Sequence, residues 1–314
     1  MYLYFRYVGL LILIFGLIGN VFTILTLETT KQFYSNPFRI YTIISILNSI
    51  FILIIHLGLL IADTFLTCSL RATITWICKL YSYITYFPIY VSITILAVAS
   101  IDRWFSTCRS TKLRKFSSKR NAIISIIFIV LFFGILLIPH PIYTEVFYDP
   151  TRNMTKCNRQ KGFYQIYTNY ILVLGVHVIP IVVMIIFGYL TYRNLRSGNH
   201  LRVIHRITLK ERINAQLSRT LIIQIITFIV FIIPNWIVNI IYPAATAQIV
   251  NRSAERIAIE LFLSDLTMII YDINFADTFY IFLLVSPAFR RSFKKLLRTT
   301  RNTNQIDVLP MHTN

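Results

Sequence analysis

The chain has 314 residues, of which 56% are apolar and only 14% are charged, and its mean hydropathy is +0.66. Soluble domains carry about 25% charged residues, so this composition excludes a disordered, collagen-like or ordinary cytosolic protein. The net charge of +19 would suit a nucleic-acid-binding protein, but the charges lie in short stretches between long apolar runs. A membrane protein without a nucleic-acid partner is therefore expected.

Seven apolar windows follow one another along the chain, each long enough to cross a bilayer as a helix. A hydrocarbon core of about 30 Å needs roughly 20 helical residues, because backbone groups cannot stay unpaired in lipid. Six windows lack Asp, Glu, Lys and Arg, and the seventh contains Asp272 and Asp277. The windows cover residues 7–27, 40–62, 80–101, 122–144, 162–192, 220–250 and 266–289. The sequence thus predicts an all-α membrane protein with a seven-helix bundle within residues 1–285.

The distribution of basic residues predicts the orientation of this bundle. With the N-terminus outside, 22 of the 31 Lys and Arg residues lie on the cytoplasmic side, as the positive-inside rule favours. Two Asn-x-Ser/Thr sequons, at Asn153 and Asn251, then fall in outer loops and are candidate glycosylation sites. We expect a multi-pass protein of the plasma membrane with an extracellular N-terminus.

Short motifs recur in a fixed order along the seven windows. In order they are Gly19-Asn20, Cys78, Asp102-Arg103-Trp104, Cys157, Pro180, Phe228 and Pro234. This ordered set resembles the rhodopsin-like (class A) family of G-protein-coupled receptors. The resemblance covers the chain from residue 7 to about residue 298 and implies the seven-helix receptor fold.

Two cysteines, Cys78 and Cys157, fall on the side that faces the oxidising extracellular space. The resemblance implies that a disulfide joins them and ties the top of the third helix to the second outer loop. The other interpretation is two buried free thiols. Cys68 has no assigned partner, and Cys108 is cytoplasmic.

Asp102-Arg103-Trp104 closes the third window and is similar to the Asp-Arg-Tyr motif of the family. By that resemblance, the carboxylate holds the arginine in the silent receptor and releases it to meet a heterotrimeric G protein. Taken alone, Arg103 would be an ordinary basic residue of the cytoplasmic side. Many receptors add a carboxylate at the cytoplasmic end of helix six, where this chain has Asn214. An ion pair between helices three and six is therefore not expected.

Four polar residues fall at mid-membrane depth, where polar groups are costly. The resemblance places them in the sodium-binding network of the family, but the ligating Asp of helix two is an Asn here, which removes the charge that a hard cation needs. We expect a polar helix-packing cluster without a metal. The residues are Asn20, Asn48, Ser92 and Asn274.

The outer halves of the helices offer a predicted ligand pocket of aromatic, amide and acidic side chains. By the resemblance, Asp272 replaces the retinal-binding Lys of opsins and Thr85 replaces the Asp of amine receptors, so both ligand classes are disfavoured. Asp265 and Asp272 share one helix face with Met268, which suits a peptide that carries a basic group. The predicted pocket contains Tyr81, Thr85, Tyr86, Asn235, Trp236, Asn239, Asp265, Met268 and Asp272.

The two acids of this pocket leave alternatives open. No Lys or Arg lies in the seven windows, so the expected partner of Asp272 is water, a hydroxyl such as Thr85 or Tyr86, or the ligand. Asp265 could instead face water at the mouth of the pocket. Two basic or polar stretches, at residues 112–115 and 216–219, resemble invertebrate neuropeptide receptors of the FMRFamide type.

The segment after the seventh window predicts an eighth helix over residues 286–298 and a short cytoplasmic tail over 299–314. Phe289, Phe293, Leu296 and Leu297 share one face, with basic residues opposite, as in a helix that lies on membrane lipids. The alternative is a basic, solvated tail.

The leading interpretation is a receptor that couples an extracellular ligand, a neuropeptide by the weaker resemblance, to a heterotrimeric G protein. The competing one is a seven-helix transporter or channel in which Asp272 and Asp277 handle an ion. An enzyme is not expected, because the sequence offers no nucleophile constellation, phosphate loop or metal-ligand cluster, and no cofactor is implied.

Overall fold

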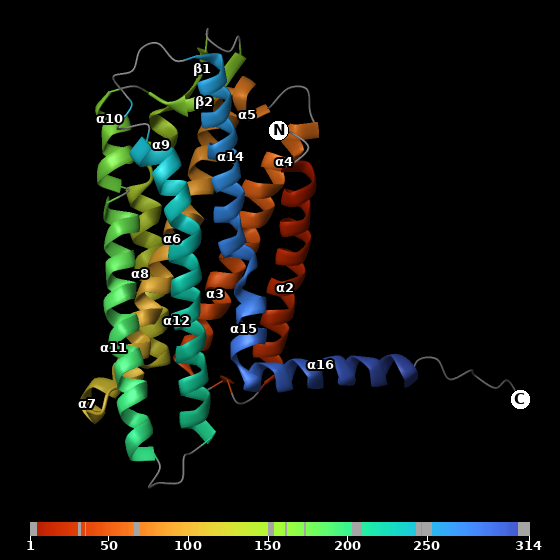
Figure 1. Cartoon of the computed structure of the whole chain (residues 1–314), viewed down its shortest axis with the longest axis vertical. Coiled ribbons are helices and arrows are strands. Elements are labelled where there is room, and N and C mark those ends of the chain that lie inside the picture. The colour runs from red at the N-terminus through yellow and green to blue at the C-terminus, as the bar shows by residue number, and fades with distance from the viewer. Residues whose placement is uncertain are drawn as a thin grey trace, which may run out of the picture.

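The computed structural model describes residues 5–30, 33–34, 36–65, 70–149, 154–160, 162–172, 174–202, 209–242, 246 and 253–306. Within these residues the chain is almost entirely helical, and its long helices run side by side as a bundle (Figure 1). Six single helices are long and apolar enough to cross a membrane, and a bent pair supplies the seventh span. The seven-helix bundle expected from the sequence is confirmed.

The spans differ from the predicted windows mainly at their ends. The third helix runs past its window at both ends, and the sixth begins at Arg212, before its window starts at residue 220. A helix can continue beyond the apolar run that predicts it, because its backbone bonds are made within the helix. Within the described residues the sixth span is Arg212–Ile241, and the seventh begins at Glu255, before the predicted start at 266. The spans are Tyr7–Thr29, Pro37–Asp63, Thr75–Thr107, Lys119–Ile142, Tyr170–Ser197, Arg212–Ile241 and Glu255–Ala276 with Thr278–Val285.

The first four spans are α-helical, with short π-helical turns in the first two. The π-helical η1 precedes the first long helix, and η3 interrupts the second span near its middle. In chain order these elements are η1 (Phe5–Gly9), α2 (Leu10–Thr29), α3 (Pro37–Ile52), η3 (Leu53–Leu57), α4 (Gly58–Phe65), α5 (Leu70–Thr73), α6 (Thr75–Thr107), α7 (Thr111–Arg114), α8 (Lys119–Leu136) and α9 (Pro139–Ile142).

An outer β-hairpin and three further spans complete the fold. Strands β1 (Thr144–Asp149) and β2 (Met154–Arg159) form a two-stranded antiparallel sheet in which Val146 faces Cys157. The remaining elements are α10 (Phe163–Ile166), η4 (Tyr167–Leu172), η5 (Leu174–Val178), α11 (Ile179–Arg202), α12 (Leu209–Trp236), η6 (Ile237–Ile241), α14 (Ala254–Ala276), α15 (Thr278–Val285) and α16 (Pro287–Ile306).

Helix starts follow ordinary capping chemistry. The side chain of Asn36 accepts a hydrogen bond from the Phe38 amide at the start of α3, with Pro37 in the first helical position. Ser118 and Ser253 cap α8 and α14 in the same way. Each cap satisfies one of the amide groups that a helix leaves unpaired at its N-terminus.

Two glycines let α2 approach the seventh span closely. A Cβ atom added at Gly16 would lie 2.8 Å from the Cβ of Ala276, and one at Gly19 would lie 2.9 Å from the Cβ of Phe279. Small residues at such spacing allow helix backbones to pack tightly in a membrane.

The seventh span bends by 55° between α14 and α15. The break falls at Asp277, which ends α14 and precedes α15. No proline is present at this break, and the side chain of Asn274 donates to the Tyr271 carbonyl one turn before it. Side-chain bonds of this kind compete with the helical ladder, which is consistent with a bend at this point.

The eighth helix, α16, crosses the end of the bundle opposite the β-hairpin, roughly perpendicular to the long helices (Figure 1). It starts at Pro287 and runs to Ile306, eight residues past the predicted end at 298. Phe293 contacts the rings of Phe22 and Phe279 at 5.4 and 5.2 Å between centroids. The apolar face thus packs on α2 and α15.

Candidate functional site

At the C-terminal end of α6, the guanidinium of Arg103 is fully enclosed. Its side chain is 1% exposed, and its Nε donates to Oδ2 of Asp102 at 3.1 Å, with a second bond from Nη2 to the same oxygen. The ring of Phe38, from the start of α3, lies 5.1 Å from the guanidinium carbon. A buried charge pair is tolerated only when paired in this way, so Arg103 is held inside the bundle.

Trp104 lies apart from this pair. Its ring packs against Phe187 of α11 at 5.3 Å and against its neighbour Phe105 at 4.9 Å. The structure therefore brings Asp102 and Arg103 together and places Trp104 on the side that faces the fifth span.

The four predicted polar-core residues divide into separate contacts. Asn48 donates to the hydroxyl of Ser92 at 3.2 Å and to the carbonyl of Pro88 at 3.1 Å, which joins α3 to α6. Asn20 donates to the carbonyl of Phe275 at 2.9 Å and joins α2 to α14. Asn274 bonds within its own helix. These bonds serve helix packing in the interior.

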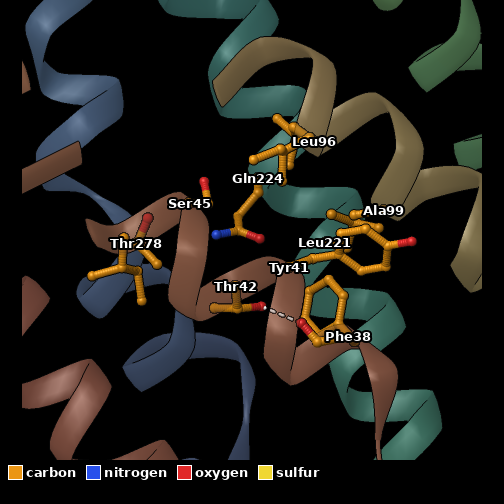
Figure 2. A pocket seen from close by; sticks show the side chains of 11 residues that line it. Phe38, Tyr41, Thr42, Ser45, Leu96, Ala99, Leu221, Gln224 and Thr278 are labelled. Carbon is orange, nitrogen blue, oxygen red and sulfur yellow. Dashed lines mark hydrogen bonds between the residues drawn. The ribbon is translucent and has the colours of Figure 1, made fainter. Parts of the chain in front are cut away.

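Two small cavities lie in the inner half of the bundle, with volumes of about 20 and 50 Å³. Ser45, Gln224 and Thr278 line both, and Figure 2 shows these side chains gathered from three helices. The larger cavity is also lined by Asn274 and Asp277, and Asp277 is the one carboxylate among its lining residues. Each cavity has room for a water molecule. Gln224 belongs to this site and was missed in the sequence, where an amide in an apolar run stood alone.

In the half of the bundle nearer the β-hairpin, an aromatic network links the third, fourth, fifth and sixth spans. Tyr86 contacts His140 edge-on at 4.9 Å, and Nδ1 of His140 lies 2.5 Å from the hydroxyl of Tyr164. His177 lies between Tyr90 and Trp236, at 5.6 and 5.5 Å from their rings. The ring of Tyr90 also lies 5.9 Å from that of Tyr86, so the network connects two predicted pocket residues, Tyr86 and Trp236. The histidines were not predicted here, because they lie far apart in sequence.

Arg159 was also missed by the sequence analysis. It ends β2, two residues after Cys157, and its guanidinium lies 4.9 Å above the ring of Tyr86 and donates to Thr168 at 3.1 Å. Burial alone would lower the pKa of Arg159, but the surrounding tyrosines, first Tyr86, raise it, so the residue stays cationic. Its position two residues after Cys157, a cysteine that was already predicted to be in the bridge, is the sequence signal that could have identified Arg159.

Two other predicted pocket residues, Asn239 and Thr85, differ in their hydrogen bonding. Asn239 donates to Thr267 at 3.2 Å and accepts from Ser264 at 2.5 Å, which ties η6 to α14. Thr85 is buried, and its hydroxyl has no hydrogen-bond partner among the described residues. The side chains of Tyr81, Asn235, Trp236 and Met268 are half-buried.

Asp272 has a different partner from those expected. The imidazole of His56, in η3, lies with Nδ1 at 3.2 Å from Oδ1 of Asp272, and Asp272 is 0% exposed. His56 is not among the partners expected from the sequence, which were water, Thr85, Tyr86 or the ligand, and the rotation of helix two turns it toward helix seven. Asp265, seven residues earlier, is half-buried. Asp272 therefore forms an interhelical contact, and Asp265 is the more accessible acid.

A disulfide joins Cys78, at the start of α6, to Cys157 in β2, with 5.5 Å between the Cα atoms. This is the pairing that the resemblance implied. The bridge anchors the hairpin over the outer end of α6 and so positions Arg159. The sequons at Asn153 and Asn251, and Cys68, lie outside the described residues.

A separate groove of about 640 Å³ lies on the outer part of the fourth and fifth spans. It is lined by aromatic and aliphatic residues such as Tyr143, Phe163 and Tyr167, and by Gln160. None of the predicted pocket residues lines this groove. The groups of three or more His, Cys, Asp or Glu that could hold a metal ion are also absent from the part of the chain that the structure describes.

The chain was compared with models of known protein families. A model described as the 7 transmembrane receptor (rhodopsin family) matches residues 19–271. The match starts in α2 and ends in α14, so it includes Asp102 and Arg103, both cysteines of the bridge and most of the predicted pocket.

Proposed function

The chain belongs to the rhodopsin family of seven-transmembrane receptors, and we propose that it transmits the binding of an extracellular ligand to a heterotrimeric G protein. It is a multi-pass membrane protein and a signalling receptor by family. The proposal also includes its location in the plasma membrane. Its N-terminus is placed outside, because most Lys and Arg residues lie on the side of the bundle opposite to the N-terminus.

The observation that carries the proposal is the state of Arg103. The side chain is enclosed at the cytoplasmic end of the bundle, paired with Asp102 and covered by Phe38. A cation stored in this way becomes available to a cytoplasmic partner when the helices around it separate. We infer that this arrangement is the silent form of the receptor, and that Asp102, Arg103 and Trp104 take part in coupling.

The ligand that best suits the outer half is a peptide with a basic group. Tyr86, Trp236 and the amides nearby offer stacking surfaces and hydrogen bonds, as pockets that bind organic ligands do. Asp265 is half-buried and is our candidate for the contact with the basic group. Asp272 instead contacts His56, and this contact holds helices two and seven together beside the pocket. The resemblance to FMRFamide-type receptors points to a neuropeptide.

The competing function, an ion transporter or channel, would use Asp272 and Asp277. No specific observation favours it, since Asp272 contacts His56 within the protein. Family membership favours the receptor.

Nucleotide exchange on purified G proteins tests the proposal directly. The full chain, reconstituted in lipid nanodiscs, would be screened with fractionated peptide extracts against a panel of heterotrimers. We expect at least one fraction to accelerate exchange with the wild-type chain, and no acceleration with Arg103→Ala at equal protein concentration. Equal acceleration by both chains would contradict the proposed coupling.

The ligand contact has its own test once an active fraction is found. Asp265→Asn should weaken the potency of a basic peptide at least tenfold, which corresponds to about 1.4 kcal/mol. A neutral variant of the same peptide should lose potency on the wild type and be indifferent to the substitution. Unchanged potency of the basic peptide on Asp265→Asn would remove this acid from the proposed pocket.

A further inference from the structure

The cytoplasmic end of α12 carries two amide side chains, Asn214 and Gln216, that contact different parts of the bundle. Residues two apart in an α-helix are separated by about 200° around its axis, so they point to opposite sides. Asn214 points toward the start of α3, and Gln216 points toward the junction of α15 and α16. The sixth span is thus held from two sides at one level.

Asn214 bonds to a residue that is already engaged. Its Oδ1 accepts a hydrogen bond from Nδ2 of Asn36 at 2.6 Å, and Asn36 is 7% exposed. The other end of the Asn36 amide, Oδ1, accepts from the Phe38 amide at 3.0 Å and caps α3. Asn36 therefore fixes the first turn of α3 and holds the sixth span with the same side chain.

The capped turn is also the part of α3 that covers Arg103. Phe38 lies 5.1 Å from the guanidinium carbon and is 2% exposed. A continuous series of contacts thus runs from Arg103 through Phe38 and Asn36 to Asn214. Moving the end of α12 away from α3 breaks the hydrogen bond between Asn36 and Asn214. Asn36 is also the residue that caps the helical turn whose Phe38 covers Arg103.

On the other side, Gln216 accepts hydrogen bonds at the start of α16. Its Oε1 lies 3.1 Å from the amide nitrogen of Ala288 and 3.4 Å from the hydroxyl of Ser286. The amide groups in the first turn of a helix have no partner within that helix, so an acceptor from outside is stabilising there. Gln216 thereby connects α12 to the eighth helix.

We propose that Asn36, Asn214 and Gln216 are positioning residues that form an uncharged clamp, which holds the cytoplasmic end of the sixth span inward while Arg103 is covered. This inference rests on the proposed function. The clamp includes residue 214, where many receptors of the family carry the carboxylate of an ion pair between helices three and six. This chain has an amide at that position, so it cannot form that ion pair. Because its members do not titrate, its strength does not depend on pH in the physiological range.

Each clamp contact is weak enough to be reversed by a ligand. One net hydrogen bond changes an equilibrium between two states by about threefold to tenfold. Losing one contact should therefore raise the population of the open form by that factor, without unfolding the bundle.

Aspartate substitutions separate a specific clamp from a general packing effect. Asn36→Asp keeps a good helix cap and an acceptor for the Asn214 amide, so it should remain silent. Asn214→Asp keeps an acceptor for Asn36 and should also remain silent. The double variant places two carboxylates in contact, which repel, so it should open the sixth span. Gln216→Ala removes the second contact, and Arg212→Lys, an exposed change on the same helix that keeps its charge, is the matched control.

Two readouts are measured on the full chain in nanodiscs. The first is basal nucleotide exchange on G proteins without ligand. The second is the distance between spin labels at Arg120→Cys and Arg219→Cys, two exposed cytoplasmic positions on α8 and α12, measured in each variant. The expected result is an outward shift of the label on α12 and a rise in basal exchange of about threefold to tenfold for the double variant and for Gln216→Ala.

The outcomes distinguish the clamp from the proposed coupling. An unchanged label distance in the double variant, with thermal stability equal to the wild type, would overturn the clamp. A similar opening in either aspartate single variant would also overturn it, because the bond is retained there. An opened sixth span without any nucleotide exchange across the panel would support the clamp and contradict coupling to a G protein.

Discussion

The contact between His56 and Asp272 makes a strong prediction about stability. His56→Leu removes the one hydrogen-bond partner that the described residues give to Oδ1 of Asp272, while Oδ2 has none among them. Breaking a buried pair by removing one member costs about 3 to 5 kcal/mol. An unpaired Asp in a membrane helix costs about 2.5 to 3.5 kcal/mol on insertion scales, which agrees with the lower part of that range. We therefore expect His56→Leu to destabilise the receptor by about 3 kcal/mol, or roughly a hundredfold in the folded-to-unfolded ratio.

A double-mutant cycle with Asp272→Leu tests this reasoning by thermal unfolding of the ligand-free chain in nanodiscs. The single variant His56→Leu should lower Tm by roughly 5 to 10 °C. The double variant should recover most of this loss, because replacing both members by apolar residues leaves no unpaired buried polar group. Additive losses, with a coupling energy near zero, would refute the view that Asp272 is an interhelical contact and would restore it as a candidate ligand group.

Three further predictions concern the bridge, the coupling site and the inner cavities. Replacing Cys78 by Ser should cost about 2 to 5 kcal/mol, because the bridge closes a separation of 79 residues, and should lower surface expression; a non-reduced digest with both thiols free would contradict the bridge. Arg103→Ala should abolish G-protein activation while ligand binding is retained, and Asp102→Asn should raise basal activity by freeing Arg103; normal activation by the alanine variant in an exchange assay would count against the mechanism. Agonist affinity should show little sensitivity to sodium, since Asn48 replaces the ligating carboxylate; a shift specific to sodium, not reproduced by potassium, would point instead to Asp277 in the cavity of about 50 Å³.

Several site residues became visible only through the packing of distant segments. His56 and Asp272 are 216 residues apart, and Asn36 and Asn214 are 178 apart. Asn214 was already noted as the residue that replaces a carboxylate of the family, but its partner lies in the loop before helix two and could not be identified from spacing. Arg159 illustrates the same point, because its place above Tyr86 depends on the disulfide that holds the hairpin over α6.

The sequence by itself determined the number of helices, their order and the family of the chain. An apolar run of about 20 residues has one low-energy form in a bilayer, a helix with all its backbone bonds made internally, so the length of each run is sufficient. The contacts between helices required the tertiary structure, for a physical reason. These helices are apolar on nearly every side, so no amphipathic stripe indicates how each is rotated about its axis. Whether Asp272 faces a ligand or His56, and whether Asn214 meets Asn36, depends on that rotation.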